Sequence, residues 1–143
     1  MSKQPDVLFT VLGSCVSVCL WDAESAIAGM NHFVFPGRPG DPLQRGPRFG
    51  IEAIHGLLER MEATGADLSH TIAKVFGGAR IPEVRSGSKS ISAQNVVVAL
   101  QLLRQRGIRV VASDLGGHYG RKVLFDTGTG SVWLKYLVES GRE

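Results

Sequence analysis

The sequence has no long apolar run, no dense block of like charge and only two cysteines in its 143 residues. A membrane-spanning helix needs about 20 consecutive apolar residues, and no stretch of that length is free of charge, so membrane insertion is not expected. The 16 basic and 13 acidic residues are spread along the chain, without the basic stripe of a nucleic-acid-binding protein. Neither nucleic acid nor a lipid bilayer is therefore an expected partner.

The two cysteines, Cys15 and Cys19, are only four residues apart in a segment that is expected to be extended. A disulfide between them would close a very small loop, so we expect free thiols and a cytoplasmic, reducing location. Hydrophobic residues make up 43% of the chain and charged residues 20%, which is the composition of an ordinary globular domain. The length suits one such domain, and we expect residues 1–143 to form it, with a core at about 7–138.

Hydrophobic periodicity predicts two helices among several strands. Apolar residues recur every three or four positions over 49–65 and 92–106, with Gly65 and Gly107 placed at the C-terminal ends. Strands are predicted at 7–21 with a break at Gly13 and Ser14, and at 26–35, 71–76, 108–112, 122–125 and 131–137, of which 108–112 is expected to be buried. A Ser-rich loop is predicted between Gly77 and Ser90. This order indicates an α/β fold, a single-domain layered sandwich with a mixed or antiparallel sheet core flanked by helices, with the strand directions left open.

The segments on either side of residues 22–25 predict a hairpin that places a cysteine opposite a histidine. If these four residues form the loop, Trp21 pairs with Ala26, and the same register places Cys15 opposite His32. Directly opposed side chains share a face and have Cβ atoms about 4.5–5.5 Å apart. A thiol and an imidazole at that spacing form the pair used in nucleophilic catalysis, in which the imidazole accepts the thiol proton and later protonates the leaving group.

Under the same hypothesis the turn before the cysteine has a catalytic role, because Gly13 and Ser14 can direct backbone N–H groups toward a developing oxyanion. The alternative is structural. Free cysteine is among the most buried residue types, so Cys15 is then a small hydrophobe and His32 a hydrogen-bonded core histidine. Cys19 has no acid or base opposite it and is interpreted as a packing residue. The catalytic hypothesis depends on the register, since a slip of one residue would send His32 to the other face.

The other histidines and the glycine pairs give weaker signals. His55 and His70 are expected at the surface, and neither has a second ligand at the spacing of a metal site. His118 lies among glycines and is a candidate to line a site. Gly77 and Gly78 follow a predicted strand as a sharp turn, without the spacing of a phosphate-binding loop. No metal or other cofactor is expected.

Four short motifs together resemble those of one protein family. In chain order they are Leu12-Gly13-Ser14-Cys15-Val16, Asn31-His32 followed by Pro36, Lys74-Val75-Phe76-Gly77-Gly78-Ala79, and Gly116-Gly117 with Gly120-Arg121-Lys122. With this order and spacing, over about residues 10–137, the chain resembles the chemoreceptor glutamine deamidases of the CheD family. The resemblance implies a layered α/β fold similar to bacterial toxins that deamidate Rho proteins. It also implies conversion of selected receptor glutamines to glutamate with release of ammonia.

The resemblance further implies which residues carry out the catalysis. The family's nucleophile falls on Cys15, its histidine on His32, and a threonine that orients the histidine on Thr10. Further candidates to line the site are Asn31, Gly77, Gly78 and His118. The cytoplasmic helices of chemoreceptors are the implied substrate, and the CheY-phosphate phosphatase CheC is an implied partner in organisms that have it.

One segment departs from the family pattern. Residues 91–95 read Ile-Ser-Ala-Gln-Asn, where glycine and arginine are expected before the asparagine. Two other hypotheses therefore stay open. One is a non-catalytic adaptor that binds receptors or CheC, and the other is a receptor methylesterase, which would use the same thioester route.

Overall fold

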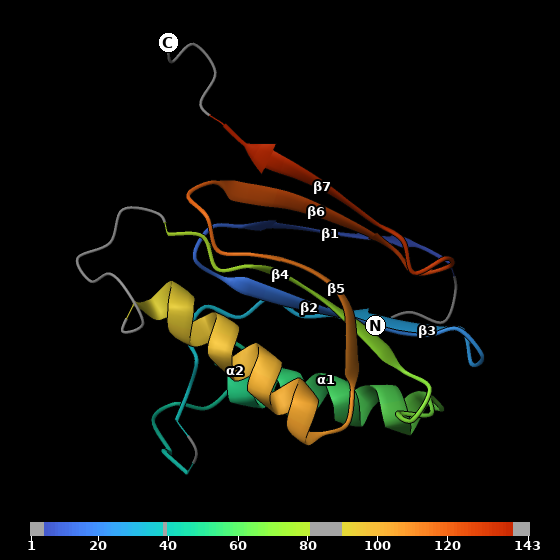
Figure 1. Ribbon diagram of the computed structural model, residues 1–143. Helices are drawn as coiled ribbons and strands as arrows, with labels where there is room; N and C mark the ends of the chain where they lie inside the picture. Colours follow the sequence, from blue (N-terminus) through green and yellow to red (C-terminus); the bar gives the residue numbers. More distant parts are fainter. Residues whose placement is uncertain (1–4, 39, 81–89, 139–143) are drawn as a thin grey trace.

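The computed structural model describes residues 5–38, 40–80 and 90–138, which form seven strands and two helices (Figure 1). In chain order these are β1 (Val7–Leu12), β2 (Val16–Asp22), β3 (Ile27–Met30), α1 (Gly50–Thr64), β4 (Ile72–Gly77), α2 (Ile91–Gln105), β5 (Arg109–Leu115), β6 (Gly120–Asp126) and β7 (Val132–Leu137). The predicted α/β class, with a mixed sheet and flanking helices, is confirmed.

The strands form two sheets that are stacked on one another. The four-stranded sheet has the order β3-β2-β4-β5, in which β4 and β5 are parallel and the other pairs antiparallel. The three-stranded sheet is antiparallel, with the order β1-β6-β7. Figure 1 shows both helices below the four-stranded sheet and the three-stranded sheet above it. Because β1 and β2 belong to different sheets, the chain crosses between the two layers at residues 13–15.

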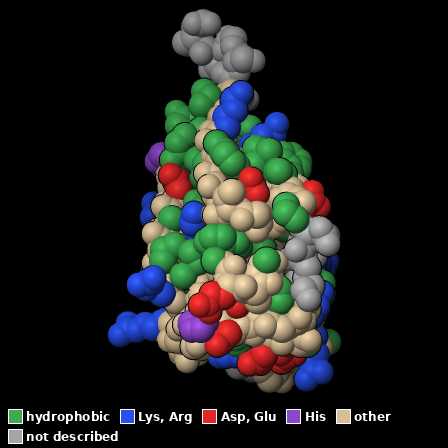
Figure 2. Space-filling model, turned by 90° about the vertical axis from the view of Figure 1, so that its right-hand side faces the viewer, with side chains coloured by type: hydrophobic (Ala, Val, Ile, Leu, Met, Phe, Trp, Pro, Cys, Tyr) green, Lys and Arg blue, Asp and Glu red, His purple; other side chains and the backbone are tan. Residues whose placement is uncertain are grey.

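The three-stranded sheet leaves its outer face exposed. Along β1, Val7, Phe9 and Val11 are about half exposed and alternate with less exposed side chains. Figure 2 shows hydrophobic side chains on the upper part of one end of the molecule, at the level of this sheet. Since side chains of a strand alternate between faces, Thr10 points toward the four-stranded sheet. Neither helix of the described residues is long and apolar enough to span a lipid bilayer.

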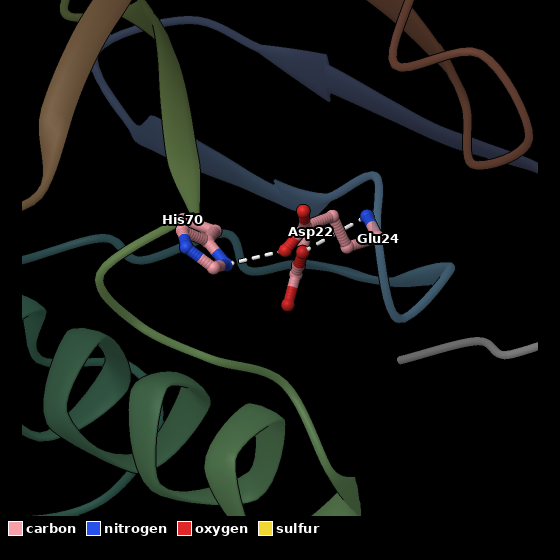
Figure 3. A group of neighbouring side chains, drawn as sticks. All are labelled: Asp22, Glu24 and His70. Atoms are coloured by element: carbon pink, nitrogen blue, oxygen red, sulfur yellow. Dashed lines mark hydrogen bonds and ion pairs between the residues drawn. The ribbon is translucent and has the colours of Figure 1, made fainter.

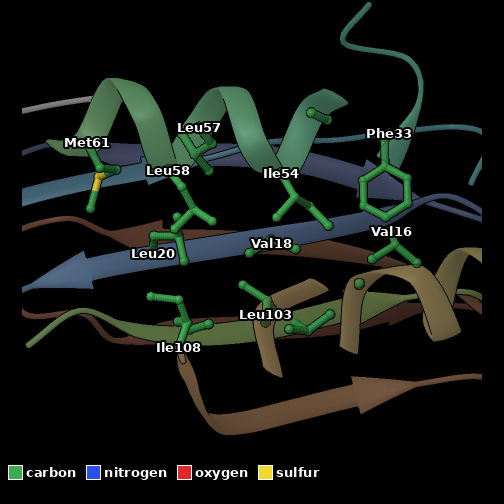
Figure 4. Packing of buried hydrophobic residues seen from close by; sticks show 14 of the residues in the cluster. Val16, Val18, Leu20, Phe33, Ile54, Leu57, Leu58, Met61, Leu103 and Ile108 are labelled. Carbon is green, nitrogen blue, oxygen red and sulfur yellow. The ribbon is translucent and has the colours of Figure 1, made fainter. Parts of the chain in front are cut away.

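Alternation along β2 divides the interior into two cores. Val16, Val18 and Leu20 are fully buried against the helices (Figure 4). Cys19 faces the other way, into a cluster between the two sheets. The helical side of the first core is built from residues spaced three and four apart, as predicted: Ile54, Leu57, Leu58 and Met61. Each large aliphatic side chain buried in this way stabilises the fold by about 1.5–3 kcal/mol, so β2 is firmly fixed between its neighbours.

The start of α1 is held by backbone groups and has no capping side-chain hydrogen bond. The N–H of Gly50 donates to Phe35 O at 2.7 Å, and the N–H of Ile51 donates to Pro36 O at 3.2 Å. The first N–H groups of a helix have no partner within the helix, so these bonds fasten the segment after the candidate histidine to the start of α1. At the other end, Gly65 adopts the left-handed conformation with φ 120°, as expected for a C-terminal cap.

Two strands differ from their predicted extents. β3 ends at Met30, although the extended pattern continues to residue 35, and β5 runs on to Leu115. The prediction that residues 108–112 form a buried strand is wrong, because β5 lies at the edge of its sheet and is largely exposed. Its valines favour a strand without requiring burial. Most of the predicted Ser-rich loop lies outside the described residues.

Candidate active site

Cys15 lies in the short connection that leads from the three-stranded sheet into β2. Residues 13 and 14 form a bend immediately before it, as predicted. Two backbone hydrogen bonds hold this connection from the end of β4. The N–H of Gly78 donates to Cys15 O at 2.8 Å, and the N–H of Ala79 donates to Gly13 O at 3.0 Å. The candidate nucleophile is therefore fixed by the backbone of residues 77–79.

The approach between these two segments requires glycine. Gly77 has a φ of +114°, and a Cβ at this position would lie 2.2 Å from Cys15 O. Any side chain at residue 77 would therefore push the backbone of Cys15 away. Gly78 has a φ of +68°, and its Cβ would lie 2.5 Å from Val96 Cγ2. The two glycines that the sequence proposes as site-lining residues thus support the backbone of the candidate nucleophile.

The register of the predicted hairpin is wrong by two residues. Trp21 pairs with Ala28, whereas the sequence predicts Ala26. Because side chains alternate with a period of two, this shift keeps every side chain on its predicted face. Cys15 and His32 are therefore diagonal neighbours on one face instead of directly opposed residues. In a regular antiparallel pair that relation corresponds to a separation of about 7–8 Å.

Asp22 accounts for the shift, because it is the last residue of β2 and not the first residue of the loop. Its Oδ1 accepts a hydrogen bond from the Glu24 N–H at 3.1 Å, and its Oδ2 accepts one from the Asp67 N–H at 2.8 Å. Burial alone would raise the pKa of Asp22, but these N–H donors and that of Ser25 lower it. The loop is consequently formed by residues 23–26. Hydropathy alone does not distinguish a loop at residues 23–26 from the predicted loop at 22–25.

Asn31 directly follows β3 and holds the next residue outside a regular strand. Its Oδ1 accepts a hydrogen bond from the Val18 N–H at 2.9 Å, where a regular ladder would use the backbone carbonyl of Asn31. Pairing resumes at Phe33, which exchanges two hydrogen bonds with Val16 at 3.1 and 2.9 Å. His32 lies between Asn31 and Phe33, which are both bonded to β2. The partner of Phe33, Val16, directly follows the candidate nucleophile. The same strand pairing therefore fixes both candidate catalytic residues.

Thr10 contacts His32 across the gap between the two sheets. Thr10 Oγ1 lies 2.7 Å from His32 Nδ1, which joins β1 at the edge of one sheet to the segment after β3 at the edge of the other. This contact occupies Nδ1, so Nε2 is the ring nitrogen left for chemistry. When Nδ1 carries the proton and donates it to the hydroxyl, Nε2 is the basic nitrogen. Among the described residues no carboxylate is hydrogen-bonded to this ring, so a neutral hydroxyl orients it. The contact is the one that the family resemblance implies for Thr10.

Partial burial shifts both candidate catalytic groups toward their neutral forms. Burial raises the pKa of the Cys15 thiol, and a hydrogen bond from its own backbone N–H offsets this in part. Burial also lowers the pKa of His32, although this residue is exposed at the rim. Within the part of the chain that the structure describes, no hydrogen bond joins Cys15 Sγ to the imidazole. The site is thus a neutral thiol near a neutral imidazole, a geometry that often tightens only when substrate binds.

A pocket of about 550 Å³ lies beside Asn31 and the candidate histidine. Met30 lines one side of it, and Ala53, Gly56 and Arg60 of α1 line the other. A Cβ at Gly56 would have no neighbour within 4 Å, so the absence of a side chain leaves this wall open. The volume falls in the usual range for binding sites, about 300–1000 Å³. The candidate cysteine does not line this pocket, which reaches the site at the histidine.

Arg121 is a buried charged residue to which the sequence motifs gave no role. It is 2% exposed and donates hydrogen bonds to the backbone carbonyls of Gly77, at 2.9 Å, and of Asp114 and Gly116. Three carbonyls on one guanidinium tie the end of β4 to β5 and to the connection that follows it. Because Gly77 supports Cys15, this arginine stabilises the floor of the site. An arginine within an alternating apolar strand is the signal that could have revealed it.

Asn95 of α2 is a second buried polar residue that the sequence motifs left without a role. Its Nδ2 donates to Ser14 O at 3.2 Å and to Val34 O at 2.9 Å. Ser14 was predicted to help stabilise an oxyanion, and its carbonyl is directed toward α2. An asparagine on the apolar face of a predicted helix is the signal that could have drawn attention to it.

His118 is exposed in the connection between β5 and β6. This connection meets the site through the Gly116 N–H, which donates to Gly77 O at 2.9 Å. Across residues 5–38, 40–80 and 90–138, no hydrogen bond or ion pair joins His118 to His32. The structure therefore places His118 near the supporting glycine and does not bring it into contact with the candidate catalytic groups.

A separate polar group lies at the far end of β2. Asp22, Glu24 and His70 present ligand atoms within 4.8 Å of one another, and His70 Nδ1 lies 2.5 Å from Glu24 Oε2 (Figure 3). The sequence predicts His70 at the surface, where it is found, but its spacing could not reveal these neighbours. The Asp22 carboxylate is occupied by backbone N–H groups, so the arrangement is explained as a histidine–carboxylate contact beside a capped turn.

Comparison with known proteins places the chain in a family. The family model described as CheD chemotactic sensory transduction matches residues 35–136, well over half of the chain. The chain belongs to the CheD family. The matched segment contains the glycines that support Cys15, as well as Asn95 and Arg121.

Several CheD relatives extend the similarity to the rest of the chain. The "Probable chemoreceptor glutamine deamidase CheD" of Trichlorobacter lovleyi is 46% identical over 125 residues, 87% of this chain and 77% of the relative. The protein of the same name from Sulfurimonas denitrificans is 42% identical over 138 residues, 96% of this chain and 88% of the relative. CheD 1 of Anaeromyxobacter dehalogenans is 38% identical over 137 residues, 96% of this chain and 79% of the relative. The last two matches extend over the segments that carry Cys15 and His32.

Proposed function

We propose that this CheD-family protein is a protein-glutamine deamidase, which converts selected glutamines of chemoreceptors to glutamate and releases ammonia. The observation that carries the proposal is that relatives 38–46% identical over most of the chain are named probable chemoreceptor glutamine deamidases. A thiol, an imidazole and an orienting hydroxyl at one end of the sandwich support the chemistry. The expected place of action is the cytoplasmic part of the receptor.

In the first step the Cys15 sulfur attacks the side-chain carbonyl carbon of glutamine. The thiol proton passes to His32 Nε2, because Nδ1 is occupied by Thr10. The neutral imidazole can accept this proton at neutral pH, since burial lowers the pKa of His32 below its ordinary value. The resulting tetrahedral intermediate carries a negative charge on the former amide oxygen.

The intermediate collapses when His32 returns the proton to the amide nitrogen and ammonia leaves, which gives a thioester on Cys15. Water, deprotonated by the same imidazole, then attacks the thioester carbon. The C–S bond breaks, the thiol is restored and the substrate side chain becomes a carboxylate. The net reaction is the consumption of one water and the release of one ammonia for each glutamine.

Backbone N–H groups next to the nucleophile are proposed to stabilise the oxyanion. The Cys15 backbone N–H lowers the pKa of the thiol of the same residue, so it is the proposed donor to the oxyanion that forms beside the sulfur. A backbone donor placed in this way is worth on the order of 10²–10³ in kcat where it has been removed. Gly13 and Ser14 form the bend that immediately precedes this N–H.

The pocket beside His32 is the proposed binding place for the segment that carries the target glutamine. It runs along α1 and has apolar walls with charged groups at its exposed rim, which suits one face of an amphipathic helix. Replacement of Gly56 by leucine would narrow the pocket that this residue lines, because the space around a Cβ at this position is open. Gly56→Leu should raise KM roughly tenfold with little change in kcat, the sign of lost substrate binding. Gly56→Ala is the control.

The test of the function is incubation of the protein with a chemoreceptor cytoplasmic fragment, followed by peptide mass spectrometry for glutamine converted to glutamate. Cys15→Ser changes one atom and should remove the conversion and the accompanying release of ammonia. Conversion that persists at the same rate in Cys15→Ser would sink the cysteine mechanism. The absence of conversion with the wild-type protein would sink the deamidase itself.

A non-catalytic adaptor that binds receptors or a CheC-type phosphatase is the second candidate. It is favoured by the resting geometry, in which no hydrogen bond links the described Cys15 thiol to His32. Binding of receptor fragment or CheC that survives Cys15→Ser, without any conversion of glutamine by the wild type, is the result that supports it. Methanol released from a methylated receptor would indicate an esterase that uses the same thioester route.

A further inference from the structure

Asn95 joins the two segments that carry the candidate catalytic residues. It lies on α2, is fully buried, and donates one hydrogen bond to Ser14 O and one to Val34 O. Ser14 directly precedes Cys15, and Val34 follows His32 by two residues. One amide group therefore contacts the nucleophile segment and the histidine segment together.

From this geometry we infer that Asn95 is a positioning residue, which sets the separation of Cys15 and His32 from a rigid helix outside the substrate-binding surface. The inference rests on the proposed deamidase function. The register makes the two catalytic candidates diagonal neighbours, so small movements of either segment decide whether thiol and imidazole meet. A misplacement of about 1 Å can cost on the order of 10²-fold in rate.

The buried amide of Asn95 destabilises the fold at one atom, and packing alone does not explain why an amide is there. Asn95 Oδ1 is buried and, among the described residues, has no hydrogen-bond donor. An apolar side chain of similar shape would avoid this unpaired atom but would leave the carbonyls of Ser14 and Val34 without the donor that joins them. The arrangement is therefore explained by what Nδ2 holds together.

Ser92, one turn earlier on the same helix, provides the matched comparison. It is 1% exposed, and its hydroxyl lies 3.2 Å from the hydroxyl of Ser90, at the start of the helix. Ser92→Ala thus removes a buried polar group from the same helix without touching the contacts of Asn95. It controls for any general effect of loosening α2.

The experiment measures kcat and KM for deamidation of a chemoreceptor fragment by the full chain. Asn95→Leu keeps the approximate shape and removes the donor, and it should lower kcat about 100-fold while KM changes less than about threefold. Ser92→Ala should keep kcat within about twofold of the wild type under the same conditions. Equal kcat in Asn95→Leu and the wild type, both folded, would overturn the inference.

Asn95→Asp adds a second measurement, the pH dependence of kcat, which distinguishes a positioning role from a merely structural one. A protonated carboxyl can donate one hydrogen bond to these carbonyls, whereas a carboxylate can donate none. Burial raises the pKa of such a carboxyl, so its kcat relative to the wild type should be highest in acid and fall as pH rises. A ratio that does not change with pH would count against positioning by Nδ2.

Failure of this inference can be told apart from failure of the proposed function. Alkylation of Cys15 by iodoacetamide needs no substrate, and its rate should change in Asn95→Leu while it stays unchanged in Ser92→Ala. If the wild type does not deamidate, the function fails and alkylation alone tests the positioning. If the wild type deamidates and both variants match it in both assays, the positioning fails and the function stands.

Discussion

The two cysteines lie four residues apart on one face of the same chain segment, yet their surroundings differ. Cys15 is partly buried in the connection before β2, where the backbones of the glycine turn and the bend converge. Cys19 is 1% exposed in the middle of β2, between the two sheets. Burial raises the pKa of Cys19 to about 12, so it stays a neutral thiol at any physiological pH. The same residue type thus serves packing at one position and is available for chemistry at the other.

The difference shows that the end of the strand, and not its composition, creates the candidate site. Within β2 the backbone groups of Cys19 belong to the pairing with β3 and β4. Cys15 precedes the first residue of β2, and its own backbone N–H lowers the pKa of the thiol. A nucleophile needs such a free donor beside it as well as an approach path for the substrate.

The largest effect is expected from the matched pair Cys15→Ala and Cys19→Ala. Cys15→Ala should lower kcat for deamidation by on the order of 10⁴-fold or more, because the proposed nucleophile is lost. Cys19→Ala should leave kcat within about twofold and lower the free energy of unfolding by about 1–2 kcal/mol, because it leaves a small cavity. Ammonia release and urea denaturation measure the two quantities. The contrast breaks down if Cys19→Ala abolishes activity in a fully folded protein.

A smaller effect is expected at the hydroxyl that orients the imidazole. Thr10→Val keeps the shape of the side chain and removes its hydrogen bond to His32 Nδ1, so the ring loses its orientation. We expect kcat to fall by about 10–100-fold with KM nearly unchanged. Thr71→Val is the control, because the Thr71 hydroxyl is also hydrogen-bonded, to Asp67 O at 2.8 Å, but at the far end of the four-stranded sheet from Cys15. Similar losses of kcat in both variants would mean that Thr10 acts only on stability.

Periodicity predicted the parts of the fold that depend on side-chain alternation. Both helices and the break before Cys15 follow from the sequence, because apolar spacing and glycine reflect local preferences. The hairpin register did not, since it is decided by backbone N–H groups that converge on the Asp22 carboxylate, one of them from residue 67. The face of Cys15 and His32 was still correct, because the slip was an even number of residues.

Long-range polar contacts were beyond the reach of sequence patterns. Asn95 and Arg121 donate hydrogen bonds to backbone carbonyls of distant segments. Every residue type has a backbone carbonyl, so the sequence does not show which residues accept these bonds. The contact between Thr10 and His32 was anticipated only through the family resemblance. Spacing along the chain could not show that β1 and the end of β3 lie at adjoining edges of two sheets.

The smallest expected effect, and the sharpest test of the two cysteines, is the pH dependence of their alkylation by iodoacetamide in the native protein. Burial raises the pKa of Cys15 above the ordinary value of 9.0, so its rate should still be rising in alkaline solution. Cys19, with a pKa of about 12, should stay unmodified until the protein unfolds. Mass spectrometry of the two peptides measures both rates.

The acid limb of deamidation completes this test, because the proposed mechanism needs neutral His32. Burial lowers its pKa below 6.5, so protonation should reduce the rate only at a pH more acidic than an ordinary histidine would require. Thr10→Val should change the height of the profile more than the position of this limb, since burial of the ring and not the hydroxyl causes the shift. A Cys15 alkylation midpoint below that of free cysteine would instead indicate a thiolate paired with a charged imidazole. The resting site would then be ionised before substrate binds, and the neutral pair derived from the burial of both groups would be wrong.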